Sequence, residues 1–432
     1  MPDIKQKTKI LNLPTKTLMQ LLGPSIVFVA LSLNGGEMLL WPDLVAQFGL
    51  KIIWPIPLIL LLQFVVNLEI ERYTAVTGKN TLKGLIEINK FVAVLFPISI
   101  LISLAWPAWG STAGNILAFI FGFSQFGAWF AIAVLLGLIL IWNSKRSYQI
   151  LETIAKIGLS TVFVIVLGTV IFKWRPEVWA ELGSGMLNFG HIPASIDKFA
   201  FVSALAYGGV AGVLNLVQSD WVFNRKYAAS SHDKPQEIDW EHSDTKLSWK
   251  AWWNLMLKEH FLLFYIGNFV GIFLLAILAF LVLTGTGVSG FKLLATEINI
   301  LNQDFLGLGY AFGLAVFLLF MMAQMTILDA QGRLLKQCLN TKLSSERLSQ
   351  IAGGIGILIL IGTALIPGFN QPLILLKISA SMSAAVMAFY PPLLLYLNSK
   401  LPKETQANIL TKILVGACSL FYAGIVIWGL IG

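Results

Sequence analysis

Two polar groups lie inside the first long apolar run of the chain, residues 19–46. Asn34 and Glu37 stand three residues apart, and the two residues between them are glycines. Paired glycines disfavour a continuous helix, and a carboxylate inside an apolar run is costly unless it serves a function. A break here would expose a carboxylate, an amide oxygen and free backbone carbonyls, which are the oxygen ligands that hard cations prefer.

A second apolar run, residues 194–223, carries a similar interruption. It contains Gly208, Gly209 and Gly212, and Asn215 follows within one turn. The interrupted runs are the first and the sixth of the chain, an offset that fits an internal repeat of five helices. Two such segments in corresponding positions are the best sequence indication of a transporter's central binding site. The alternative is that the glycines only allow helices to pack closely.

We predict that the chain unwinds at residues 34–37 and 208–215, and that both breaks face one cavity. In that cavity Asn34 and Glu37 are the candidate ligands for a metal ion, with carbonyl oxygens near Gly209 beside them. The predicted substrate-binding set comprises Asn34, Gly35, Glu37, Gly209, Gly212 and Asn215.

Four further residues in apolar runs are predicted to line a transport pathway: Trp106, Trp109, Gln324 and Lys377. Tryptophan faces beside a carboxylate make a suitable pocket for an organic ammonium ion. Lys377 and Glu37 together could hold a zwitterion such as an amino acid. The alternative for Lys377 is a side chain that simply extends to the outer membrane interface.

The composition decides the class of protein. Of 432 residues, 57% are hydrophobic and 12% are charged, and the mean hydropathy is +0.78. A soluble domain usually carries about 25% charged residues, so lipid is the expected solvent. No phosphate-binding glycine loop, histidine and cysteine cluster or activated nucleophile is present, which argues against an enzyme, an ATP-driven pump and any cofactor. The basic residues form no patch, so no nucleic-acid partner is expected.

The apolar runs predict eleven transmembrane helices, at 19–46, 51–71, 91–120, 126–143, 149–174, 194–223, 261–286, 308–335, 347–367, 372–397 and 411–430. With a cytosolic N-terminal tail at 1–18, the cytosolic side holds 23 Lys and Arg residues and the opposite side holds 6. This asymmetry follows the positive-inside rule, and a miscounted helix would invert every later loop. We therefore expect an integral cell membrane protein with its C-terminus outside.

Two polar stretches fall on the predicted cytosolic side. Glu69, Glu71 and Arg72 close the second run and form either a cytosolic gate or a solvated helix end. Residues 224–258 form a cytosolic insertion whose end is rich in tryptophan. Because tryptophan favours the headgroup zone, this end is predicted to be an interfacial helix. Its tryptophans are Trp249, Trp252 and Trp253.

A recognisable series of residues begins at Gly23-Pro24, continues through Asn34-Gly35-Gly36-Glu37 and Phe48-Gly49-Leu50-Lys51 to Trp54, and includes Thr77-Gly78-Lys79-Asn80. On these residues the chain resembles the NRAMP divalent-metal transporters. The resemblance implies an all-α membrane protein with the LeuT-like fold. Two inverted five-helix repeats, at 19–174 and 194–397, would be followed by an eleventh helix at 411–430.

The functional motifs of that family are altered. The family's first-helix Asp-Pro-Gly-Asn is Asn34-Gly35-Gly36-Glu37 here, so one carboxylate and one amide remain with their positions exchanged. The sixth-helix Met-Pro-His aligns with Gly212-Val213-Leu214, which removes the thioether that selects soft metals. The acidic residues assigned to the family's proton route align with Trp106 and Trp109, which carry no proton.

We therefore expect a monomeric secondary transporter or facilitator that works by alternating access. Its expected substrate is a hard divalent cation of the Mg²⁺, Mn²⁺ and Ca²⁺ class, moved without the family's usual proton coupling. An organic ammonium or amino-acid substrate is the alternative. A channel is less favoured because no repeated filter sequence is visible.

Overall fold

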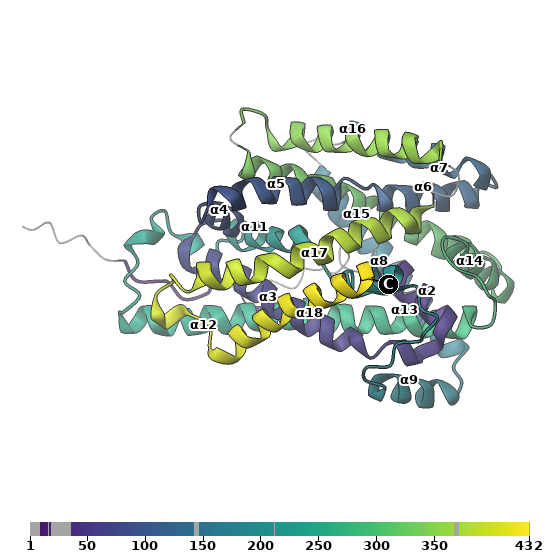
Figure 1. Ribbon diagram of the computed structural model, residues 1–432, viewed down its shortest axis with the longest axis horizontal. Helices are drawn as coiled ribbons and strands as arrows, with labels where there is room; N and C mark the ends of the chain where they lie inside the picture. Colours follow the sequence, from purple (N-terminus) through teal and green to yellow (C-terminus); the bar gives the residue numbers. More distant parts are fainter. Residues whose placement is uncertain are drawn as a thin grey trace, which may run out of the picture.

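The computed structural model describes residues 9–15, 17–18, 36–141, 147–210, 212–339, 341–366 and 371–431. Helices account for most of this part of the chain, and its only β-pairing is an isolated bridge between Lys9 and Ile238. Long helices lie side by side along the longest axis of the molecule (Figure 1). The predicted all-α architecture is confirmed.

Eight long helices correspond to predicted spans. They are α3 (Pro55–Thr77), α7 (Gly127–Ile141), α8 (Ser147–Phe172), α13 (Gly267–Leu283), α15 (Leu308–Cys338), α16 (Ser345–Ala364), α17 (Pro372–Asn398) and α18 (Ile409–Ile431). By length and apolar composition, six helices of the described chain are able to cross a membrane, and up to eight spans result when each sharply bent pair counts as one. This count treats the first and second predicted spans as one bent pair, and it omits the short helix α7 and the interrupted sixth span. These three differences account for the eleven predicted spans.

The described part of the first span is helical from its beginning. Gly36–Leu40 form a π-helical turn, η1, which continues as α2 (Trp41–Phe48) and the short 3₁₀ helix η2 (Gly49–Ile52). The chain then turns by 111° into α3. Asn34 and Gly35 lie outside the described residues. Glu37 therefore sits in a π-helical turn, whereas the sequence predicted unwound chain there.

The sixth span is interrupted as predicted. Helix α10 (Lys198–Ala206) ends before the glycines, and the chain resumes as the 3₁₀ helix η4 (Gly212–Leu216) and helix α11 (Val217–Asn224). Gly209 and Gly212 have φ values of 148° and 72°, which residues other than glycine rarely adopt. The interruption is shorter than the predicted 208–215, because residues from Gly212 onward already form helical turns.

The third span is also interrupted, although a continuous helix was predicted over 91–120. It consists of α5 (Lys90–Leu104) and α6 (Ala108–Ile120), separated by Ala105, Trp106 and Pro107. Proline has no backbone N–H, so it cannot donate to the carbonyl four residues earlier, and its ring crowds that carbonyl. The prediction missed this break because apolar content alone was used to place the span.

The predicted helix near residue 250 is present, but it is not a separate element. Helix α12 (Ser243–His260) continues through the π-helical turn η7 (Phe261–Ile266) into α13, and Ser243–Leu283 is one helix of 41 residues. Trp249 and Trp252 are buried against neighbouring segments of the protein. The indole N–H of Trp252 donates to the carbonyl of Asn12 at 2.8 Å.

Shorter helices cover the two ends of the bundle. Helices α4 (Thr81–Ile86) and α12 lie at one end, and α9 (Glu177–Leu187) and α14 (Lys292–Asp304) lie at the other (Figure 1). We call these the inner and the outer end, after the predicted topology. Short 3₁₀ turns complete the connections at Ser124–Phe126, Ala228–Ser231, Pro235–Glu237 and Lys403–Thr405.

Loops predicted on the same side do gather at the same end. At the inner end, Lys246 pairs with Glu404 at 3.4 Å. At the outer end, Lys173 pairs with Asp304 at 2.8 Å, and the indole of Trp54 donates to the carbonyl of His191 at 2.9 Å. The predicted order of the helices places each of these pairs of loops at the same end of the bundle.

Helix α14 carries a buried acid that makes stability depend on pH. Burial raises the pKa of Glu297 from 4.5 to about 8. Because the unfolded chain ionises first, the stability present below pH 4.5 is lost progressively as the pH rises toward 8. At pH 7.5 this difference in ionisation lowers the free energy of unfolding by about 4 kcal/mol. We expect Glu297→Gln to raise the melting temperature at pH 7.5 and to leave it nearly unchanged at pH 5.

Thermal melting in detergent across that pH range tests this expectation. Glu177→Gln is the matched control, because Glu177 is an exposed acid on the outer-end helix α9. Equal pH profiles for wild type and Glu297→Gln would show that Glu297 is ionised in the folded protein.

Candidate functional site

Glu37 lies in the interior of the bundle. Its residue is 1% exposed, on the turn η1, which packs against α10 and α13. Its carboxylate interacts electrostatically with the hydroxyl group of Tyr207. Tyr207 is the first residue after α10, at the break in the sixth span. The predicted carboxylate and the predicted break are therefore neighbours in the structure.

A chain of hydroxyl groups joins the breaks of the third and sixth spans. Ser379 donates to the carbonyl of Ser103 at 2.6 Å, which is the carbonyl left without its helical partner by Pro107. Since that hydrogen bond uses the Ser379 proton, the Tyr207 hydroxyl donates to Ser379, at 2.7 Å. Ser383 lies 3.3 Å from the Tyr207 oxygen and extends the chain. All four residues are buried.

Sequence reasoning missed these hydroxyl groups. The available signal was the series Ser379, Ser381 and Ser383 in an otherwise apolar run, which places hydroxyls on a helix that contacts two broken helices. Gly212 packs against the same helix, because a Cβ added there would lie 2.8 Å from the Cβ of Ser383. The glycines thus serve both the break and close packing.

Gln63 of α3 holds the broken end of α10. Its amide nitrogen donates to the carbonyl of Ala206 at 3.1 Å and to the hydroxyl of Tyr422 at 2.8 Å. A helix ends with carbonyls that lack helical partners, so this contact satisfies one of them. A Cβ added at Gly209 would lie 2.7 Å from the Gln63 side-chain oxygen. Gly209 therefore needs to be glycine for space as well as for its φ angle.

The two tryptophans of the third span have different surroundings. Trp109 is buried, and its ring centre lies 5.6 Å from that of Tyr207, so it borders the break. Trp106 is partly exposed, and its indole N–H donates to the carbonyl of Ile102 at 2.9 Å. Of the two aromatic residues predicted to line the pathway, the structure brings Trp109 to the site.

Gln324 stabilises the beginning of a helix, and Asn215 stabilises a contact between two helices. Gln324 of α15 accepts a hydrogen bond from the backbone N–H of Gly110 at 2.9 Å, in the first turn of α6, where N–H groups lack helical partners. Asn215 donates to the hydroxyl of Tyr390 at 3.3 Å and so joins η4 to α17. Both side chains help to hold the interrupted helices in place.

Lys377 lies in a cavity at the outer end. This cavity has a volume of about 540 Å³, and its polar lining includes Asp43, Asn115, Asp197, Gln371 and Lys377. The Lys377 ammonium pairs with the Asp197 carboxylate at 2.6 Å. Asp43 stands six residues after Glu37 and accepts a hydrogen bond from the backbone N–H of Gly290 at 2.9 Å. The cavity borders α2, which follows η1 directly in the chain.

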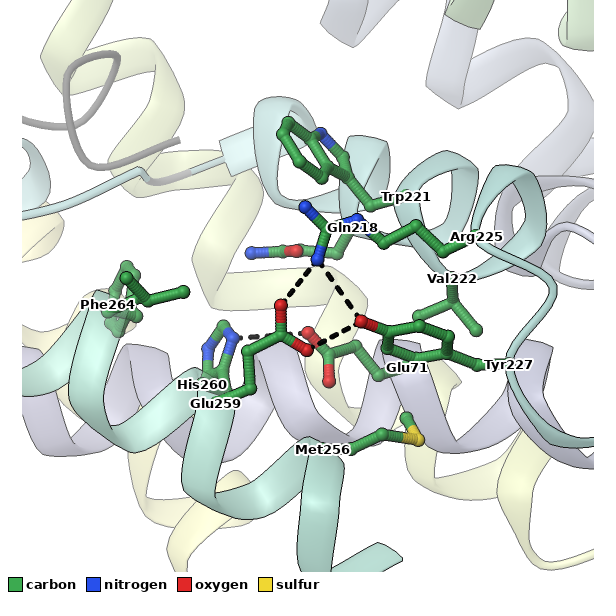
Figure 2. Close-up of a pocket in the computed structure, with 11 residues that line it drawn as sticks. Glu71, Gln218, Trp221, Val222, Arg225, Tyr227, Met256, Glu259, His260 and Phe264 are labelled. Carbon is green, nitrogen blue, oxygen red and sulfur yellow. Dashed lines mark hydrogen bonds and ion pairs between the residues drawn. The ribbon is translucent and has the colours of Figure 1, made fainter. Parts of the chain in front are cut away.

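A smaller pocket lies at the inner end and is lined by charged groups (Figure 2). The ring nitrogen Nδ1 of His260 lies 3.1 Å from the Glu71 carboxylate. Arg225 pairs with Glu259, and the Tyr227 hydroxyl donates to Glu259 at 2.7 Å. Burial, followed by the Glu259 charge, raises the pKa of Tyr227 above its ordinary value, so Tyr227 keeps its proton.

Phe264 separates this inner pocket from the break in the sixth span. Its ring lines the pocket, and a Cβ added at Gly209 would lie 3.0 Å from the ring. The inner pocket has a volume of about 40 Å³, compared with about 540 Å³ for the outer cavity. Of these two pockets, the outer one is the larger.

The donor set around the break contains oxygen and few charges. In the described part of the chain, no group of three or more His, Cys, Asp and Glu residues is placed to hold a metal ion. The available oxygen ligands include one carboxylate, the hydroxyl groups near Tyr207, backbone carbonyls and the amide oxygens of Gln63 and Asn215. The thioether of Met387 lies 3.5 Å from the amide nitrogen of Asn215. Such a set suits a cation that keeps part of its water shell.

By sequence, no protein-family model and no curated protein matches the chain. By structure, it is similar to a manganese transporter of Eremococcus coleocola. A single-residue mutant of that protein superposes with a TM-score of 0.72 at 13% identity, covering 100% of this chain and 92% of the other. The same transporter in complex with an aromatic bis-isothiourea substituted compound gives 0.70 at 14% identity, covering 100% and 98%.

More distant structures share the architecture. MhsT in complex with L-phenylalanine gives a TM-score of 0.54 at 13% identity, covering 97% of this chain and 99% of the other. Mhp1, a nucleobase-cation-symport-1 family transporter, gives 0.55 at 11% identity, covering 94% and 92%. The chain has the LeuT-like fold. Its apolar helices make it a multi-pass integral membrane protein, as predicted.

The hydroxyl chain generates a prediction about stability. Ser379→Ala removes the partner of the Ser103 carbonyl and of the Tyr207 hydroxyl, and leaving buried polar groups unsatisfied costs about 1–3 kcal/mol each. We expect a clear fall in melting temperature in detergent. Ser381→Ala is the matched control. Ser381 is only partly buried, and its hydroxyl group is hydrogen-bonded to Ser203, which is not part of the hydroxyl chain. Equal losses in both variants would contradict the assigned role of Ser379.

Proposed function

We propose that the protein is a secondary transporter of a small cation that works by alternating access. The observation that carries the proposal is the position of Glu37, a buried carboxylate beside Tyr207 at the break of the sixth span. Charged groups at this depth are retained where they bind substrates or ions. The outer cavity gives access from one side, and Phe264 closes the path on the other.

The favoured substrate is a hard divalent cation. The ligands near Glu37 are oxygen atoms, and the sequence has no Met or His at the sixth-span positions where soft-metal ligands were expected. A single carboxylate leaves room for retained water, which suits Mg²⁺ and Mn²⁺. The shared fold with a manganese transporter supports a metal ion. Asn34 remains a predicted ligand.

A second candidate is an organic ammonium or amino-acid substrate. The observation in its favour is the aromatic pair of Trp109 and Tyr207 near Glu37, since aromatic faces bind organic cations. MhsT, which has the same fold, was crystallised with L-phenylalanine. The zwitterion hypothesis that paired Glu37 with Lys377 is weakened, because the Lys377 charge is already compensated by Asp197.

Ion binding should depend on the Glu37 charge. We expect Mn²⁺ and Mg²⁺ at millimolar levels to raise the melting temperature of the wild type and to enter proteoliposomes. Glu37→Gln should abolish both effects, because a charge-assisted contact is lost and nothing else in the set is anionic. Trp106→Phe should leave the affinity within about twofold, since Trp106 contacts its own helix.

A different pattern of ligand stabilisation would contradict the metal proposal. If Mg²⁺, Mn²⁺ and Ca²⁺ all leave the melting temperature unchanged while an ammonium or amino-acid ligand raises it, the metal proposal is wrong. Trp109→Ala should then be the damaging substitution, because Trp109 is the tryptophan that borders Tyr207.

We also propose that the transported ion does not carry protons with it. Trp106 and Trp109 occupy the positions of the acids that carry protons in the NRAMP family, and neither side chain titrates. We expect ion uptake without a matching pH change, measured with a pH dye inside proteoliposomes. The rival hypothesis is that Glu37 itself carries a proton, and substrate-dependent proton flux that disappears in Glu37→Gln would establish it.

A further inference from the structure

The imidazole of His260 stacks with two phenyl rings. Its ring centre is 5.4 Å from that of Phe64, at an interplanar angle of 25°, and 5.1 Å from that of Phe264, at 9°. Cations within about 6 Å of an aromatic ring centre are attracted by its π face. Both phenyl rings are therefore close enough to stabilise a positive charge on this imidazole.

The edge of the same ring meets a carboxylate. Nδ1 of His260 lies 3.1 Å from a Glu71 oxygen, and the two side chains are 6% and 9% exposed. Protonation of the imidazole would place a full positive charge at this distance from the Glu71 carboxylate. Low exposure makes that added attraction stronger than it would be in water.

The other charged groups around the pocket are already paired. From α11 and the segment after it, Arg225 and Tyr227 both bind Glu259. On α3, Glu69 pairs with Arg72 at 2.8 Å. Among the described residues of this pocket, His260 is the group that an ion pair joins to Glu71. Its protonation therefore sets the charge of the pair.

This pair is connected to the break in the sixth span. Phe264 stands one helical turn after His260 and stacks on it, and the same phenyl ring fills the space beside Gly209. Glu71 belongs to α3, whereas His260 and Phe264 belong to the continuous helix of α12, η7 and α13. The contact between Glu71 and His260 binds α3 to this helix. It therefore also holds Phe264 beside the break in the sixth span.

We propose that Glu71 and His260 form a proton-binding site and that its bound proton keeps an inner gate closed. The inner gate consists of Glu71 and His260 with the rings of Phe64 and Phe264. With the proton bound, the imidazolium holds Glu71, Phe64 and Phe264 together, and the path from the break to the inner end stays closed. Loss of the proton leaves a neutral histidine beside Glu71 and removes the charge from both ring contacts. The gate then opens more readily. The proton stays on the gate and is not transported.

The first test uses thermal melting in detergent from pH 5 to pH 8.5, which spans the range where imidazole titrates. It uses the Glu297→Gln background, so that Glu297 does not add its own pH dependence. A proton bound more tightly in the folded state adds stability at low pH, and this stability is lost as the pH rises. We expect a fall of several degrees across the range, absent in His260→Gln.

Two variants make this result decisive. His191→Gln is the control, because His191 is an exposed histidine at the outer end, and it should keep the fall. Glu71→Gln retains a hydrogen-bond acceptor and should lose the fall as His260→Gln does. If His260→Gln and its parent show parallel curves, the pair binds no proton in this range and the proposal is wrong.

The second test measures function and rests on the proposed transport of an ion. In proteoliposomes, raising the pH at the inner end from 5.5 to 7.5 should increase Mn²⁺ uptake severalfold in the wild type and have little effect in His260→Gln. Phe264→Leu should transport rapidly at both pH values. Proton flux matched to Mn²⁺ uptake and lost in His260→Gln would overturn the proposal in favour of a coupled proton. Absence of any ion uptake would instead count against the proposed function, while the melting curves still decide whether the pair binds a proton.

Discussion

The central constraint on this structure is that backbone groups inside a bilayer must find partners within the protein. In the described part of the chain, the third and sixth transmembrane segments are interrupted, and each interruption frees carbonyls or N–H groups. Side chains from other helices meet them: Ser379 binds the Ser103 carbonyl, Gln63 the Ala206 carbonyl and Gln324 the Gly110 N–H. The breaks are stable because helices far apart in sequence supply these partners.

The same partners define the site. Since Ser379 is bound to the third span, Tyr207 can donate its proton to Ser379 and take a fixed position beside Trp109. Glu37 interacts with this fixed hydroxyl from the first span. A cation near Glu37 would thus contact groups from broken helices whose positions depend on α17 and α3. Movement of these helices would alter the site, as the proposed alternating access requires.

The two ends of the path are built differently. At the outer end, a large polar cavity holds the Lys377 and Asp197 pair, whose members are partly exposed. At the inner end, ion pairs, stacked rings and Phe264 fill almost all the space. Buried pairs of this kind respond strongly to the loss of one charge, whereas exposed pairs contribute little. Control of access is therefore expected at the inner end.

The sequence by itself determined the membrane class, the order of the helices and the interruption at Gly209 and Gly212, because apolar length, charge sorting and glycine are local properties. It also identified Glu37 as the buried carboxylate. Which residues surround Glu37 was decided by tertiary structure. Tyr207, Ser379, Gln63 and Phe264 come from four different segments, and a single sequence contains no record of such long-range contacts. For the same reason, only the folded chain distinguishes Trp109 at the site from Trp106 on its own helix, and brings His260 to Glu71.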